Sequence, residues 1–240
     1  MPATQTGIRV AGVDGCPVGW IAAIFCPVTG KTDVAIADSF AALLDGPLAS
    51  AQLIVIDMPI GLSESPGRTC EKETRRAIGL RRSSVFPSPL RGMLAFDNYE
   101  EANAFGKARG AGLSKQAWNI AAKIREIDQI ITPPLQARVV EGHPELSFTR
   151  LAGAPCTHAK RTPEGKRERL RRLKDNGIND APALLERTRA AYSSKRVFAD
   201  DDLIDALALA LTAKALLGGE ALRFGDGARD ARGLLMEICG

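Results

Sequence analysis

The 240-residue sequence predicts one α/β domain built on a mixed five-stranded sheet flanked by helices. Three short apolar segments near the N-terminus are separated by tight turns, which is typical of an antiparallel meander. The later run "AQLIVID", which ends at Asp57, is almost continuously apolar over the length of a strand. Such runs are typical of a strand that is buried on both faces and paired in parallel. Helical patterns fill most of the remaining chain.

The predicted strands follow the apolar segments in chain order, and turn residues separate them. Gly19 and Pro27 bound the second strand, the turn "VTGK" precedes the third, and Gly142 and Pro144 stop the fifth. These residues are the usual punctuation between strands. The predicted strands are residues 8–13, 20–25, 32–37, 51–57 and the short segment "ARVVE" at 137–141.

Helices are predicted where a capping residue precedes an amphipathic pattern. Asp38 or Ser39 can cap the first short helix. The segment "RTPEGKRERLRRLKDNG" carries a full set of helix signals, with Thr162 as the cap and Pro163 in the first turn. The predicted helices are residues 40–44, 69–79, 99–109, 114–130, 146–151, 162–177, 182–192 and 201–217.

The chain between the fourth and fifth predicted strands is mostly helical. We therefore expect a helical insertion at about residues 63–135. Within it, "GLRRSSVFPSPLRG" at residues 79–92 contains turn residues throughout and is predicted to be a loop.

The composition excludes several classes of protein. The five cysteines are odd in number and form no C-x-x-C pair, and the chain has 2 histidines, so the sequence predicts free thiols in a reducing compartment and no structural zinc. The N-terminus lacks the features of a signal peptide. The most apolar segment, residues 203–217, is interrupted by Asp205 and Lys214 and is too short for a membrane span. We expect a soluble, cytoplasmic protein without a membrane partner.

Carboxylates end or interrupt several apolar segments. Asp14, Asp57 and Glu141 do so at predicted strands, and "DDDLIDALALAL" opens the last helix. A charge at the edge of a core costs several kcal/mol unless it is paired or bound to a metal. Several acids in such positions indicate a site for divalent cations. Asp14 can also be a hairpin residue that binds its own turn, since Asp-Gly is a frequent hairpin signal.

Asp205 is the most informative of these acids. Its helix is apolar nearly all round, which is typical of a buried helix, and Asp202 shares its face. Asp200, Asp201 and Asp202 can be explained as caps that complement the helix dipole. That explanation does not extend to Asp205, which lies beyond the first turn.

Four motifs in order, "GVDGCPVGWIAA", "VIDMPIGL", "EGHPELSF" and "DDLIDALALA", resemble the family called domain of unknown function 429, which has a ribonuclease-H-like fold. The resemblance runs from Val10 to about Leu217. It implies two divalent ions, Mg²⁺ or Mn²⁺, held by carboxylates on the first strand, the fourth strand and a late helix. The metal ligands that it implies are Asp14, Asp57, Asp202 and Asp205.

The resemblance further implies that Asp14 bridges both ions and that Gly15 turns the chain beside them. Glu141 joins the catalytic set through the family's "E-x-H-P-E" pattern, in which Glu145 can serve instead. A turn followed by a helix cap also explains the two glutamates.

The function that the resemblance implies is a metal-dependent nuclease, with DNA or RNA as its partner. Phosphates require basic contacts, and one basic group follows Asp57 closely. Its members are Arg68, Lys72, Arg75, Arg76 and Arg82. A second basic stretch covers residues 160–174. A solvated helix face explains either group as well.

Two other functions remain open at this stage. One is a non-catalytic member of the fold that binds nucleic acid or protein. The other is a phosphotransferase related to sugar kinases and actin-like ATPases, but it requires a second lobe, and the chain lacks a G-x-x-x-x-G-K-[ST] loop. The sequence leaves the oligomeric state open, with a homodimer among the options.

Overall fold

The N-terminal strands form the predicted meander. The computed structural model of the chain describes residues 7–192 and 196–240. In it, β1 (Val10–Cys16) pairs antiparallel with β2 (Gly19–Phe25), and β2 pairs antiparallel with β3 (Thr32–Ala37). The predicted parallel strand is β4 (Leu53–Ile56), which pairs with β1. With β5 (Val139–Glu141), the five-stranded sheet has the order β3-β2-β1-β4-β5, so the predicted mixed sheet is confirmed.

β1 is longer than its apolar pattern predicts. It continues through Asp14 and Gly15 to Cys16, which pairs with Gly19 across a turn at residues 17–18. The expectation that Gly15 turns the chain is therefore wrong, because Gly15 lies in the strand opposite Trp20. Backbone hydrogen bonding extends the strand past the last apolar side chain.

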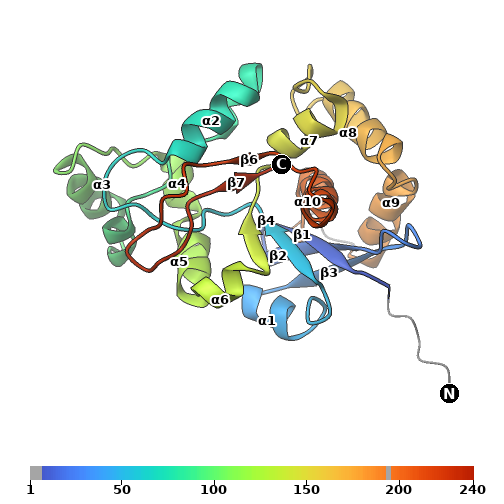
Figure 1. The fold of residues 1–240 in the computed structure, drawn as a ribbon, viewed down its shortest axis with the longest axis horizontal. Helices are drawn as coiled ribbons and strands as arrows, with labels where there is room; N and C mark the ends of the chain where they lie inside the picture. Colours follow the sequence, from blue (N-terminus) through green and yellow to red (C-terminus); the bar gives the residue numbers. More distant parts are fainter. Residues whose placement is uncertain (1–6, 193–195) are drawn as a thin grey trace. The chain divides into compact units, whose positions relative to one another are not determined.

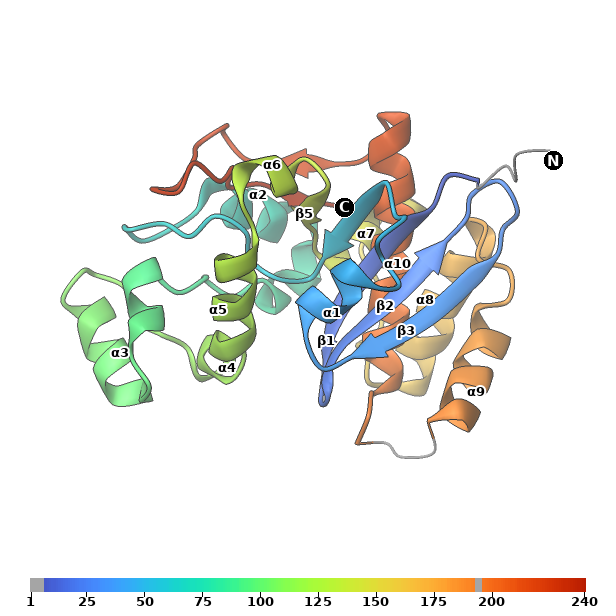
Figure 2. The same cartoon turned by 90° about the horizontal axis from the view of Figure 1, so that it is seen from below.

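The elements divide into two compact units. The first unit contains β1 to β4 with α1 (Phe40–Asp45), α8 (Pro163–Asp175), α9 (Ala181–Ala191) and α10 (Asp200–Gly218). Helix α10 packs on β1, β2 and β4, and α8 and α9 contact it. Figures 1 and 2 show α8, α9 and α10 on one face of these strands and α1 on the other.

Helix α10 and β1 approach each other closely because Gly12 has no side chain. A Cβ atom at Gly12 would lie 2.0 Å from the carbonyl oxygen of Ala206 and 2.3 Å from the amide nitrogen of Ala210. Any larger residue would push the helix away from the strand. Gly12 thus sets the distance between β1 and α10, the two elements that carry Asp14 and Asp205.

Two predicted caps are confirmed in the first unit. The Ser39 side chain accepts a hydrogen bond from the amide of Ala42 at the start of α1. The Thr162 side chain does the same for the amide of Gly165 at the start of α8. Each cap satisfies one backbone N–H that the helix itself leaves without a partner.

The second unit contains the helical segment between β4 and β5 and the C-terminal strands. Its buried core includes Cys70, Leu146 and Ile238. Its helices are α2 (Thr69–Ala77), α3 (Tyr99–Lys107), α4 (Lys115–Asn119), α5 (Ala121–Ile130), α6 (Pro133–Gln136) and α7 (Pro144–Ala152), with 3₁₀ helices at Gly79–Ser84 and Arg91–Ala95. Its strands are β5, β6 (Arg223–Phe224) and β7 (Ile238–Cys239).

Three features of this unit differ from the sequence prediction. The predicted loop at 79–92 contains the 3₁₀ helix Gly79–Ser84 and the first two residues of the 3₁₀ helix Arg91–Ala95, because turn residues also support this tighter helix. The predicted helix at 114–130 is interrupted at Ile120, whose φ of −111° and ψ of 7° are not helical. Strands β6 and β7 pair antiparallel over two residues each, too few to give an alternating pattern.

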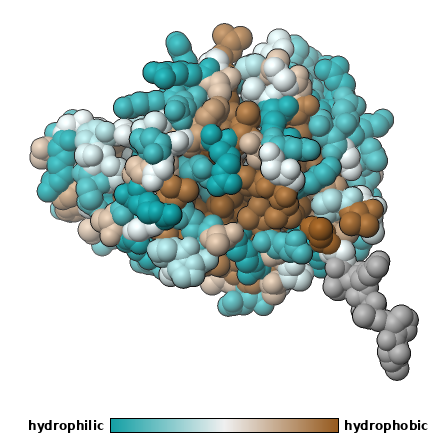
Figure 3. Space-filling view, viewed as in Figure 1, coloured by the Kyte–Doolittle hydropathy of each residue, from teal (hydrophilic) through white to brown (hydrophobic). Residues whose placement is uncertain are grey.

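The helices and the cysteines bear on two of the sequence-based expectations. In the described part of the chain, no helix combines the length and apolar character needed to cross a bilayer. The right-hand side of Figure 3, where α8 and α9 lie in Figure 1, is covered by hydrophilic side chains. No disulfide joins the cysteines of the described residues.

Candidate acidic site

Asp14 and Asp57 lie at matching positions on neighbouring parallel strands. Asp14 is in β1, and Asp57 directly follows β4. The register pairs Val13 with Ile56, and the amide of Asp57 donates a hydrogen bond to the carbonyl of Val13 over 2.9 Å. The two residues after these partners are the aspartates, so the strand register brings their backbones side by side.

Helix α10 adds two further aspartates to the same site. Asp205 is buried in the second turn of the helix, and Asp202 lies one turn earlier. The Asp202 carboxylate accepts a hydrogen bond of 2.8 Å from the amide of Ala199, so it also caps the helix. Asp200 has other partners, since it pairs with Lys166 and Arg189.

The electrostatics show that these four carboxylates act on one another. Burial raises the pKa of Asp14 well above its usual value, and the negative charges of Asp57, Asp205 and Asp202 raise it further. Burial likewise raises the pKa of Asp202 to about 6, with Asp201 and Asp205 acting in the same direction. Each shift shows that burial and neighbouring negative charge disfavour the ionised form of the carboxyl group.

We define the acidic cluster as Asp14, Asp57, Asp202 and Asp205. A basic residue of the first unit, Lys160, contacts this cluster. Its Nζ lies 2.9 Å from Oδ2 of Asp205 and 3.4 Å from Oδ2 of Asp201. Asp205 therefore has a basic partner in the fold. Sequence analysis missed this role, because Lys160 lies 45 positions before Asp205 within a stretch that resembles a solvated basic face.

The cluster fits a divalent cation in ligand type and in charge. Mg²⁺ and Mn²⁺ prefer oxygen ligands, which four carboxylates supply. The raised pKa of Asp14, caused by burial and by the three other aspartates, indicates negative charge that a cation would balance. In their present positions, no three His, Cys, Asp or Glu side chains of residues 7–192 and 196–240 form a group that could hold a metal ion.

Glu141, the fifth predicted catalytic carboxylate, pairs with the predicted phosphate contact Arg68. The guanidinium of Arg68 lies 2.5 Å from Oε2 of Glu141, and the side chains are 2% and 7% exposed. The Ile60 amide donates to the same oxygen over 2.8 Å. Burial raises the pKa of Glu141 to about 7, although Arg68 and the Ile60 amide favour its ionised form. These contacts give both residues structural partners within the second unit.

Arg68 also contacts a second buried carboxylate, that of Glu71. Arg68 also lies 3.6 Å from Oε1 of Glu71, and Glu71 accepts a hydrogen bond from the amide of Ser88. Glu145, the alternative to Glu141, is buried in the first turn of α7. The turn and helix that we considered for the "E-x-H-P-E" motif are thus present.

The remaining predicted phosphate contacts differ in their exposure. Arg75 is half-buried, and its Nε donates a hydrogen bond of 2.8 Å to the carbonyl of Val85. Lys72, Arg76 and Arg82 are exposed to solvent. These three side chains are accessible to an external phosphate as the structure stands.

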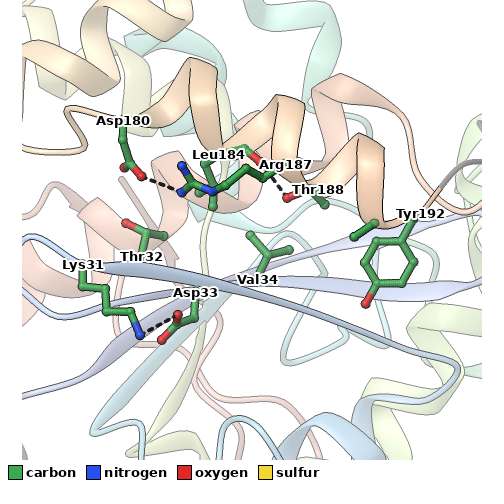
Figure 4. Close-up of a pocket in the computed structure, with 10 residues that line it drawn as sticks. Lys31, Thr32, Asp33, Val34, Asp180, Leu184, Arg187, Thr188 and Tyr192 are labelled. Carbon is green, nitrogen blue, oxygen red and sulfur yellow. Dashed lines mark hydrogen bonds and ion pairs between the residues drawn. The ribbon is translucent and has the colours of Figure 1, made fainter.

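A separate pocket of about 460 Å³ lies between β3 and α9 in the first unit (Figure 4). The charges around it form pairs, with Lys31 3.0 Å from Asp33 and Arg187 2.8 Å from Asp180. The pocket therefore lacks the excess charge that marks the acidic cluster, and none of its lining residues belongs to that cluster.

Fold and site together define an α/β protein with a mixed sheet and a carboxylate cluster where β1, β4 and α10 meet. The chain belongs to the family described as protein of unknown function (DUF429), whose family model matches residues 12–230. The matched range contains all four aspartates of the cluster. Comparison with curated proteins and with solved structures finds no match.

Proposed function

We propose that the protein is a divalent-metal-dependent nuclease with a ribonuclease-H-like fold, which hydrolyses phosphodiester bonds of DNA or RNA in the cytoplasm. The observation that carries this proposal is the concentration of negative charge around Asp14. Asp57, Asp202 and Asp205 all raise the pKa of the Asp14 carboxyl beyond the effect of its burial. Lys160 brings one positive charge to these carboxylates, which leaves a net charge suited to cations.

Within this proposal, each element contributes a defined part of the site. Two bound Mg²⁺ or Mn²⁺ ions would supply an activated water and a stabilised leaving oxygen for in-line displacement. Asp14 and Asp57 provide carboxylates from adjacent parallel strands, and α10 provides those of Asp202 and Asp205. Asp205 is nearly excluded from solvent, so its carboxylate keeps a fixed orientation.

The proposed substrate contacts are the exposed cations of the second unit. Three of the predicted phosphate contacts are exposed to solvent, namely Lys72, Arg76 and Arg82. The guanidinium groups of Arg68 and Arg75 instead form hydrogen bonds within the protein. Phosphate binding by basic side chains of this kind weakens as salt concentration rises. The helical segment that carries them corresponds to the predicted insertion at residues 63–135.

The test is a cleavage assay with metal and substrate varied together. Single-stranded DNA, branched DNA and a DNA/RNA hybrid are incubated with the protein in Mn²⁺, Mg²⁺ or chelator, beside Asp14→Asn and Asp57→Asn. We expect metal-dependent cleavage that falls on the order of 100-fold or more in each variant, a loss of about 3 kcal/mol of transition-state stabilisation. Asp33→Asn is the matched control, because Asp33 lies on β3, outside the cluster, and pairs with Arg9 and Lys31.

Cleavage that survives both substitutions at Asp14 and Asp57 would exclude the two-metal mechanism. If the wild-type protein neither cleaves any of the three substrates nor binds Mn²⁺ in calorimetry, the non-catalytic binding function replaces the nuclease.

A further inference from the structure

Lys160 forms ion pairs with two aspartates of α10. Its ammonium lies 2.9 Å from Asp205 and 3.4 Å from Asp201, while its side chain remains 40% exposed. Asp205 is 3% exposed, so the ammonium covers a carboxylate that has little access to water. The lysine is therefore a cation held by the acidic cluster.

The backbone on the N-terminal side of Lys160 is anchored by one buried carboxylate. Glu168 of α8 accepts hydrogen bonds of 3.0 Å from the amides of both Thr157 and His158. Arg169 donates to the carbonyl of His158 over 3.1 Å and is itself nearly fully buried. These contacts fix the course of the chain two residues before the lysine.

The backbone on the C-terminal side is equally constrained. The carbonyl of Ala159 accepts hydrogen bonds from the amide and the hydroxyl of Thr162, the residue that caps α8. A Cβ atom at Gly165 would lie 1.9 Å from the same carbonyl oxygen, so the turn packs directly on the helix. Lys160 thus projects from a turn whose backbone is anchored on both sides, while its side chain is partly exposed.

We propose that Lys160 is a built-in counter-ion of the acidic cluster, which a divalent cation displaces from Asp205 when it binds. The inference rests on the proposed function and names a determinant of its metal affinity. The ammonium carries one positive charge, whereas a divalent ion brings more charge to the same carboxylate ligands. The exposed stem allows the ammonium to leave Asp205 while the anchored backbone stays in place. Displacement costs part of the binding free energy, so Lys160 weakens metal binding.

The test compares Mn²⁺ binding by the wild-type chain and by Lys160→Met in isothermal titration calorimetry. Methionine keeps the length of the side chain and removes its charge. We expect Lys160→Met to bind Mn²⁺ about tenfold more tightly than the wild type, because the substitution removes a charge that competes with the metal for the carboxylates. In chelator we expect a lower melting temperature than that of the wild type, because the carboxylates then lose their counter-ion.

Lys166→Met is the matched control, because Lys166 forms an ion pair of similar length, 2.7 Å, with Asp200, which lies outside the acidic cluster. It should leave the Mn²⁺ affinity unchanged. If Lys160→Met does not fold in chelator, Lys160→Gln, which can still donate a hydrogen bond to Asp205, is titrated in its place.

Failure of this inference is distinguishable from failure of the proposed function. Wild-type binding of Mn²⁺ with equal or weaker binding by the Lys160 variant overturns the counter-ion role and leaves the metal site intact. Folded wild type and folded variant that both fail to bind Mn²⁺ overturn the counter-ion role and the proposed metal site together.

Discussion

The two units each bury carboxylates, but they treat the negative charge differently. In the second unit, Glu141 and Glu71 share the buried guanidinium of Arg68, and Arg75 also pairs with Glu71. Backbone amides donate a further hydrogen bond to each glutamate. In the first unit, burial and three further aspartates raise the pKa of Asp14, and the ammonium of Lys160, which is paired with Asp205 and Asp201, opposes this effect. The first group is close to neutral, whereas the second keeps an excess of negative charge.

The same sequence signal, an acid at the end of an apolar strand, therefore occurs in two different electrostatic environments. An acid at the end of an apolar strand marks Asp14, Asp57 and Glu141 alike. Whether such an acid serves stability or binding depends on the cations that the fold brings to it. Buried carboxylates with a matching arginine are structural, and those with unbalanced charge are candidates for a ligand.

The largest expected effect is obtained by removing the cation of the balanced group. Arg68→Met leaves Glu141 buried without its guanidinium, while Glu71 keeps its contact with Arg75. Loss of one partner of a buried ion pair costs about 3–5 kcal/mol. We expect the free energy of unfolding in urea to fall by that amount, and the double variant Arg68→Met/Glu141→Met to recover part of it.

Arg76→Met is the control for this experiment, because Arg76 is exposed on the same helix α2. Its effect should stay within about 0.5 kcal/mol. A similarly small loss for Arg68→Met would show that Glu141 and Glu71 do not depend on this arginine.

Glu168 is a carboxylate of the first unit whose charge is balanced by hydrogen bonds and by Arg172. It therefore shows whether the behaviour of a carboxylate depends on its charge balance or on the unit in which it lies. Although burial opposes it, hydrogen bonds from the amides of His158 and Thr157, the His158 ring and the charge of Arg172 lower the pKa of Glu168 to about 2. A carboxylate whose pKa is lowered by folding stabilises the protein above its unfolded value of about 4.5 and loses this contribution as pH falls toward 2.

We therefore expect Glu168→Gln to lower the free energy of unfolding at pH 7 by at most about 3 kcal/mol. The difference from the wild type should shrink as pH falls from about 4.5 to 2, measured by urea unfolding at each pH. Glu164→Gln is the control, since Glu164 is exposed and pairs only within its own helix turn with Arg167. A wild-type-to-variant difference that stays constant down to pH 2.5 would contradict the assigned shift.

Much of the fold could be predicted because single strands and helices carry local signals. The apolar runs located the strands of the sheet, and Ser39 and Thr162 marked helix starts as expected. The end of β1 could not be located, because Asp14 and Gly15 are held in the strand by pairing with β2 and not by their own side chains. The break at Ile120 has no glycine or proline to signal it.

The aspartates of the candidate site were found from their apolar surroundings, but their charge balance was not. That balance depends on contacts between residues far apart in sequence, such as Lys160 with Asp205 and Arg68 with Glu141. Both cations were grouped with basic stretches, since sequence spacing does not distinguish a solvated cation from one that reaches a buried acid. The role of Gly12, which sets the distance between α10 and β1, also has no signal in the local sequence.

The smallest expected effect has the opposite sign to the others and tests the unbalanced cluster directly. Asp14→Asn removes one of four mutually repelling charges, and its amide oxygen can still accept the hydrogen bond that the Gly15 amide donates to Asp14. In chelator at pH 7, we expect the free energy of unfolding to rise, because burial and the other aspartates both penalise the ionised form of Asp14. Added Mn²⁺ should stabilise the wild type and leave this variant unchanged, because a ligand stabilises only the state that binds it.

Asp33→Asn separates this gain from a general effect of removing a negative charge. Asp33 pairs with Arg9 and Lys31, so its replacement should lower the free energy of unfolding by a few tenths of a kcal/mol. A stabilised Asp14→Asn beside a slightly destabilised Asp33→Asn would show that charge at the cluster is in excess. A loss of stability for Asp14→Asn in chelator would instead place Asp14 among the balanced carboxylates, with Lys160 as a sufficient counter-ion.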